Sequence, residues 1–105
     1  MATIRSELQS TEVARQSANR VGFGFLLAEL GAGIAFADVA LSTKDIERRR
    51  RNTANAKKAY VTIIRFMTRV VFTDIDASAF HSDFGSLRKK LSQLGVAETA
   101  NSPTS

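Results

Sequence analysis

The residue types that could support acid–base chemistry are sparse in this chain. His81 is the only histidine, and Asp83 is the next carboxylate after it. A general base must be aimed at a nucleophile and oriented by a partner, whereas residues two positions apart lie on different sides of a helix. We therefore expect His81 to be a surface residue and the protein not to be an enzyme.

Metal and cofactor chemistry is equally poorly supported by the sequence. The chain has no cysteine and no Glu-x-x-His pair of the kind that di-iron bundles use. Its Gly-Phe-Gly and Gly-Ala-Gly triplets lack the spacing and the lysine of phosphate-binding loops. The sequence thus predicts no metal site, no cofactor and no small-molecule substrate.

Positive charge is concentrated in one segment. Residues 44–72 contain nine basic and two acidic residues, although the whole chain of 105 residues carries a net charge of only +5. At about 100° per residue, six cations fall on one side of a helix: Lys44, Arg48, Arg51, Lys58, Arg65 and Arg69. This cationic stripe is either a solvated face or a contact for an anionic partner, with nucleic acid as the leading alternative and anionic lipid a further one.

The elements that carry these residues are predicted to be helices only. Proline occurs once, at Pro103, and the apolar residues follow helical spacing. We expect helices at about residues 3–19, 23–41, 43–72 and 77–94, with a bend or break at Gly22 and Gly24 between the first and the second. The predicted fold is an all-α, three- to four-helix antiparallel bundle with one long central helix at about 43–72. It forms a single domain over 1–95, followed by a disordered tail at 96–105.

Capping residues mark the predicted helix ends. Ser42 and Asp45 form a capping-box-like start for the long basic helix. Asp76 is a candidate cap for the last helix, and Gly95 is a candidate stop.

An apolar segment at 21–41 raises the question of a membrane. It is long enough to cross a bilayer, which takes roughly 20 apolar residues. Glu29 and Asp38 interrupt it, and a carboxylate near the bilayer centre costs about 2.5–3.5 kcal/mol. We therefore favour a buried bundle helix over a membrane span. The polar first twenty residues and the missing cysteines favour a cytoplasmic protein.

The same segment predicts an assembly role. A helix that is apolar on all sides must be covered on all sides, and one small chain covers it incompletely. We expect self-association or contact with another helical protein, through aromatic and leucine residues of this helix and the last one: Phe25, Phe36, Phe80, Phe84 and Leu87.

One intrachain ion pair is predicted from the hairpin register. With a turn near residues 42–44, Asp38 faces Arg49, which the helical wheel places on the apolar side of the basic helix. We expect Asp38 and Arg49 to form a half-buried pair that sets the register of the two helices.

A limited resemblance to a known family covers residues 28–64. The motif "AELG" at 28–31, followed by a helix carrying Ala56, Tyr60 and Ile63, resembles the two halves of a tetratricopeptide-like helical hairpin. The resemblance implies a helical interaction module.

Overall fold

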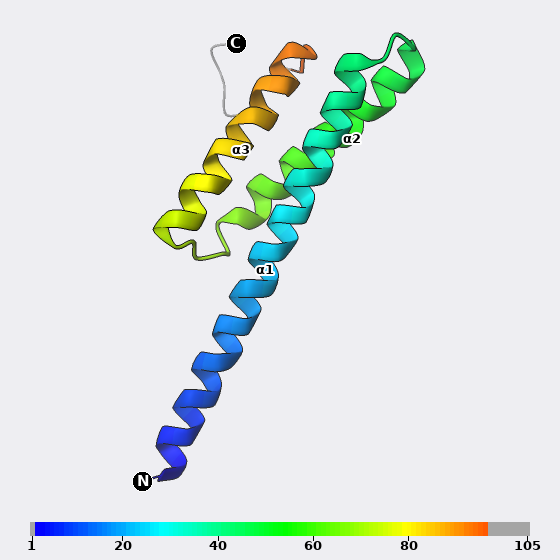
Figure 1. Cartoon of the computed structure of the whole chain (residues 1–105). Coiled ribbons are helices and arrows are strands. Elements are labelled where there is room, and N and C mark those ends of the chain that lie inside the picture. The colour runs from blue at the N-terminus through cyan, green and yellow to red at the C-terminus, as the bar shows by residue number, and fades with distance from the viewer. Residues whose placement is uncertain (1, 97–105) are drawn as a thin grey trace.

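The part of the chain that the structure describes folds into three helices. A computed structural model describes residues 2–96, with side chains from residue 10 onward. The helices are α1 (Ala2–Ser42), α2 (Ile46–Met67) and α3 (Asp74–Gln93), and residues 2–96 contain no strand (Figure 1). The all-α prediction is confirmed. Apart from Val96, the predicted tail at 96–105 lies outside the described residues.

Helix α1 is one continuous helix of 41 residues, so the predicted break at Gly22 and Gly24 is wrong. Each helical glycine costs about 1 kcal/mol relative to alanine, which is within what tertiary contact can offset. At Gly22 that contact is visible, because an added Cβ would lie 3.1 Å from Cγ2 of Val70. Consequently α1 is the longest helix of the structure, and the basic helix is not.

Helix α2 has 22 residues and is shorter than the predicted range of 43–72. Its cap is Asp45 and not Ser42, since Oδ1 of Asp45 accepts hydrogen bonds from the backbone N–H groups of Glu47 (2.9 Å) and Arg48 (3.2 Å). Beyond Met67 the chain leaves the helix and turns back toward α3.

Helix α3 begins and ends with local motifs. The hydroxyl of Thr73, rather than Asp76, caps it by accepting from the N–H of Asp76 at 3.1 Å. Gly95 has φ 81°, and the N–H groups of Val96 and Gly95 donate to the carbonyls of Leu91 and Ser92, both at 3.0 Å. This is a Schellman ending, and it confirms Gly95 as the predicted stop.

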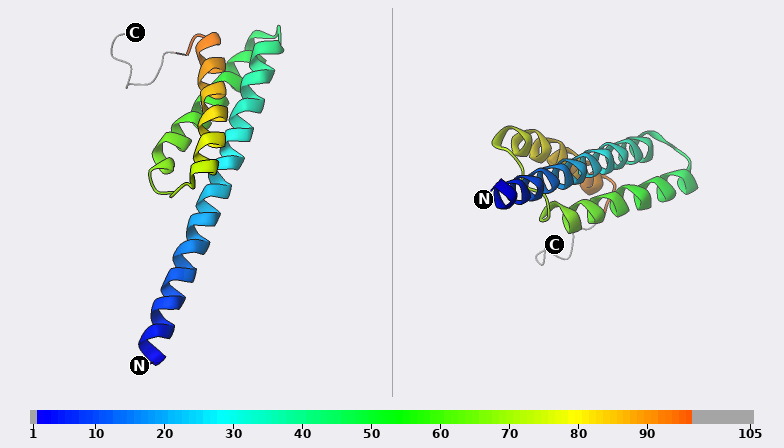
Figure 2. Two further views of the ribbon diagram at one scale, coloured as in Figure 1. Left: turned by 60° about the vertical axis from the view of Figure 1, so that its left-hand side comes forward. Right: turned by 90° about the horizontal axis from the view of Figure 1, so that it is seen from below.

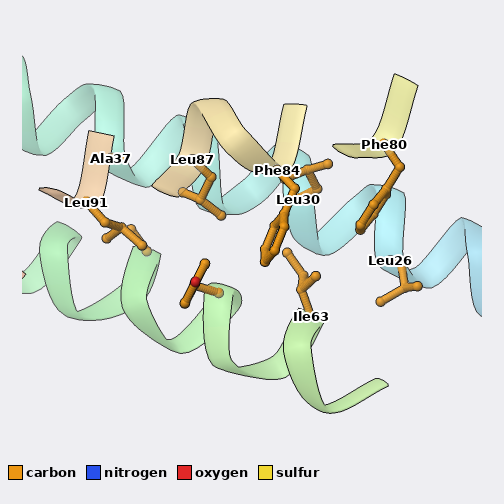
Figure 3. Packing of buried hydrophobic residues seen from close by; sticks show 10 residues of the cluster. Leu26, Leu30, Ala37, Ile63, Phe80, Phe84, Leu87 and Leu91 are labelled. Atoms are coloured by element: carbon orange, nitrogen blue, oxygen red, sulfur yellow. The ribbon is translucent and has the colours of Figure 1, made fainter. Parts of the chain in front are cut away.

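The core lies where the three helices meet (Figure 3). It combines residues from all of them: Leu26, Leu30, Ala37, Ala56, Tyr60, Ile63, Phe80, Phe84, Leu87 and Leu91. Gly33 lets the helices approach closely, because an added Cβ would lie 3.0 Å from Cδ2 of Leu87 and 3.1 Å from the Cβ of Ala59.

The N-terminal part of α1 extends beyond the bundle. Helices α2 and α3 pack along the C-terminal part of α1, and the N-terminal part continues alone (Figures 1 and 2). The molecule is therefore elongated, with a length of 66 Å. Within residues 2–96, no other helix packs beside the N-terminal part of α1.

Candidate interaction surfaces

Three of the five predicted interface residues are buried within the chain itself. Phe80, Phe84 and Leu87 belong to the core (Figure 3). The ring of Phe84 stacks on that of Tyr60, with the ring centroids 5.1 Å apart. These three residues of α3 pack against α1 and α2 and have almost no surface left for a partner. The prediction that these three residues form an intermolecular interface is therefore wrong.

The other two predicted residues come from α1. Phe36 is half-buried against the core. Phe25 is 42% exposed, and its ring meets Phe66 edge-on at 5.7 Å. Of the predicted set, Phe25 thus remains the most accessible to another molecule.

One face of α1 stays uncovered within the bundle. We define the open face as the exposed residues at helical spacing between positions 21 and 35: Val21, Gly24, Ala28, Gly31, Ala32 and Ala35. Val21 is 73% exposed, and no charged residue belongs to this set. The open face is an uncharged, mostly small-residue surface opposite the buried side of the helix.

Two glycines on the open face have no intrachain role in packing. A Cβ added at Gly24 or at Gly31 would meet nothing within 4 Å. Gly22 and Gly33 differ, because neighbouring side chains occupy the space next to each. Gly24 and Gly31 therefore weaken α1 by about 1 kcal/mol each without a compensating contact among the described residues.

Two opposite charges flank the open face. Arg20 and Asp38 are both exposed and are eighteen residues apart, which is about five turns, so they lie on the same side of α1. Arg20 was not among the predicted contact residues. The pattern was nevertheless visible in the sequence, because Arg20 and Asp38 stand at the two ends of a series of uncharged residues spaced by three and four.

Asp38 has a different partner from the predicted one. Its Oδ1 lies 2.7 Å from Nζ of Lys90 on α3. Arg49 is exposed, as is every residue from Lys44 to Arg51, so the side of α2 on which the wheel places Arg49 is uncovered there. The predicted Asp38–Arg49 pair is therefore replaced by a bridge between α1 and α3.

The six residues of the cationic stripe are all exposed. Among the described residues, none of the six has a carboxylate within 4 Å, because Glu47 pairs with Arg50 at 3.3 Å. The guanidinium of Arg69 lies 5.1 Å from the ring centroid of Phe66. The stripe is thus a cationic surface without carboxylate partners in the part of the chain that the structure describes.

A groove lies where α1 leaves the bundle. Its lining comes from α1 and from the α2–α3 connection: Glu12, Arg15, Gln16, Asn19, Arg20, Phe23, Val71, Thr73 and Asp76. A hydrogen bond and the positive charge of Arg15 lower the pKa of Glu12, which is exposed to solvent. Both signs of charge line the groove, so it has no clear preference for an anion or a cation.

His81 is exposed, with ring centroids of Phe72 and Phe80 at 6.3 Å and 6.0 Å. In the described part of the chain, no three His, Cys, Asp or Glu side chains group together in a way that could hold a metal ion.

Part of α1 also meets a simple criterion for crossing a membrane. The segment Ser10–Ser42 is long and apolar enough, with a mean hydropathy of 1.7, and 28% of the apolar stretch is buried in the bundle. The core helix of a water-soluble protein can meet the same criterion but is then mostly buried, whereas most of this stretch is exposed. Most of this apolar stretch is therefore accessible for contact with another molecule.

Comparison of the chain with known protein families, with characterised proteins and with solved structures found no match.

Proposed function

We propose that this protein is a non-enzymatic helical module that acts through protein–protein contact, with the open face of α1 as its contact surface. The observation that carries this proposal is the uncovered apolar face of the longest helix, from Val21 to Ala35. Phe25 and Leu27, which are 42% and 45% exposed, border this face.

The physical argument is one of unburied apolar surface. An amphipathic helix in water normally directs a polar face to solvent, whereas the open face presents valine, alanine and glycine. Contiguous exposed apolar surface of this kind is typical of contact sites. A second helix could approach closely, because Gly24, Ala28 and Gly31 have little or no side chain.

The proposal is tested by placing a charge in the middle of the open face. We expect the wild-type protein at micromolar concentration to elute with a mass above 11.4 kDa by size exclusion with light scattering. Ala28→Lys should return it to the monomer mass, since a buried unpaired ammonium is costly. Ser86→Lys, at an exposed position of α3, is the matched control and should leave the mass unchanged. A wild-type monomer at these concentrations would contradict self-association.

A second candidate function is supported by the cationic stripe. Six exposed cations without carboxylate partners among the described residues would suit the phosphate backbone of a nucleic acid. The contact would be independent of base sequence, because a smooth row of lysine and arginine reads charge and not base edges. This function would use α2 together with Lys44 and Arg69, which lie just outside its two ends, and would leave the open face of α1 free.

A further inference from the structure

We infer that the occupant of the open face is a second copy of α1, which runs antiparallel and is related to the first by a two-fold axis between Ala28 and Gly31. This inference rests on the proposed function and specifies its partner.

The spacing of residues along α1 is symmetric about that point. Exposed positions follow intervals of four and three in both directions from the centre: Ser17, Val21, Gly24, Ala28, Gly31, Ala35, Asp38 and Ser42. In an antiparallel pair, Ala28 then faces Gly31 of the second copy, and Gly24 faces Ala35. Small residues face small residues over the central turns, so the two backbones can approach closely. Such an approach provides the compensating contact that Gly24 and Gly31 lack within one chain.

The charges that flank the open face indicate the relative direction of the two helices. Arg20 and Asp38 lie 9.5 and 8.5 residues from the centre and flank the same side of the open face. In an antiparallel pair, the two-fold axis is perpendicular to the helices and keeps this flank of both copies on one side of the interface. Arg20 of each copy then lies near Asp38 of the other, and the attraction is made twice. In a parallel pair, the two-fold axis runs along the helices and places the same flank of the two copies on opposite sides, so Arg20 and Asp38 gain no such partner. The charges therefore favour the antiparallel pair.

The bridge from Asp38 to Lys90 is compatible with this pair. Lys90 contacts Oδ1 of Asp38, and the side chain of Asp38 remains 54% exposed. A carboxylate has two oxygens and can accept from two cations. Oδ2 can therefore accept from the arginine of the second copy.

Charge reversal tests the orientation. Arg20→Glu alone and Asp38→Lys alone should each raise the dimer dissociation constant by about tenfold, because each replaces two attractions by two repulsions. The double variant, Arg20→Glu with Asp38→Lys, should recover most of the affinity. The double variant still lacks the salt bridge between Asp38 and Lys90. If the single variants weakened the dimer only by disturbing the fold, the double variant would therefore not recover its affinity. Failure of the double variant to recover would overturn the antiparallel pair, since in a parallel pair these two positions do not meet and the second substitution restores no attraction.

Crosslinking provides an independent test, because the chain has no native cysteine. We expect a mixture of Gly24→Cys and Ala35→Cys chains to form a disulfide between unlike chains under mild oxidation. Each variant alone should not crosslink, since like positions in the antiparallel pair are about 16 Å apart along the axis. A dimeric mass without the mixed crosslink would overturn this inference and leave the proposed function standing. A monomeric mass would overturn this inference together with self-association through the open face.

Discussion

The side-chain amide of Asn19 pairs with the backbone of Val71, fifty-two residues away in the chain. Its Nδ2 donates to the carbonyl of Val71 at 2.9 Å, and the N–H of Val71 donates to its Oδ1 at 2.7 Å. These two bonds join α1 to the α2–α3 connection. Figure 2 shows that α1 leaves the bundle at the end where this connection lies.

We expect Asn19→Ala to lower the free energy of unfolding by about 1–2 kcal/mol, because two hydrogen bonds at a partly exposed site are lost. Urea denaturation followed by circular dichroism measures this change. Ser17→Ala, at an exposed position one half-turn away, is the control and should change stability by less than about 0.5 kcal/mol. Equal effects of the two variants would mean that the Asn19 bonds do not hold the connection in solution.

The glycines of α1 should respond to alanine with opposite signs. Gly33→Ala places a Cβ 3.0 Å from Leu87 and 3.1 Å from Ala59, so we expect a loss of about 1–3 kcal/mol through overpacking. Gly24→Ala meets open space and should raise the stability of the monomer by up to about 1 kcal/mol. Denaturation at a protein concentration low enough to avoid association measures both. A gain at Gly33 would contradict the close approach of the three helices there.

A double-mutant cycle separates the observed ion pair from the predicted one. For Asp38→Ala with Lys90→Ala we expect a coupling energy of about 0.2–1 kcal/mol, which is usual for a partly exposed pair. The same cycle with Arg49→Ala in place of Lys90→Ala should give no measurable coupling. Coupling to Arg49 in place of Lys90 would mean that α1 and α2 take a different register in solution.

Salt dependence tests the cationic stripe. If the stripe binds a nucleic-acid backbone, the affinity for a labelled DNA duplex should fall steeply between about 50 and 200 mM salt. Arg51→Ala with Lys58→Ala should reduce the slope of log affinity against log salt by about 2, since two phosphate contacts are removed. Fluorescence anisotropy measures this slope.

Arg88→Ala with Lys89→Ala is the control for the stripe, because it removes the same charge from exposed positions of α3. It should leave the slope unchanged. The absence of any binding at low salt, or an equal effect of the two double variants, would leave the stripe as a solvated face.

Local sequence patterns were informative about features that a single helix determines by itself, such as which residues share a face and where the helix ends. The spacing of Phe80, Phe84 and Leu87 predicted their shared face, and Gly95 marked the end of α3 because only its left-handed backbone permits that turn. Ala56, Tyr60 and Ile63 likewise shared the apolar side of α2 and are buried together.

Patterns failed where the outcome depended on a neighbouring helix. The Phe and Leu stripe of α3 could serve a core or an interface, and only the packing of α3 against the α1–α2 pair decided for the core. Gly22 and Gly24 read as a break, yet α1 continues, because packing such as that of Val70 on Gly22 outweighs a small local penalty.

The sequence by itself determined that the chain is all-helical, that its positive charge is concentrated in residues 44–72, and that residues 21–41 are apolar. Only the tertiary structure decided that one face of this apolar helix stays open, that Asp38 meets Lys90, and that the first half of α1 leaves the bundle. The physical reason is that helical periodicity specifies which side chains share a face, whereas the crossing of three helices specifies which of those faces is covered.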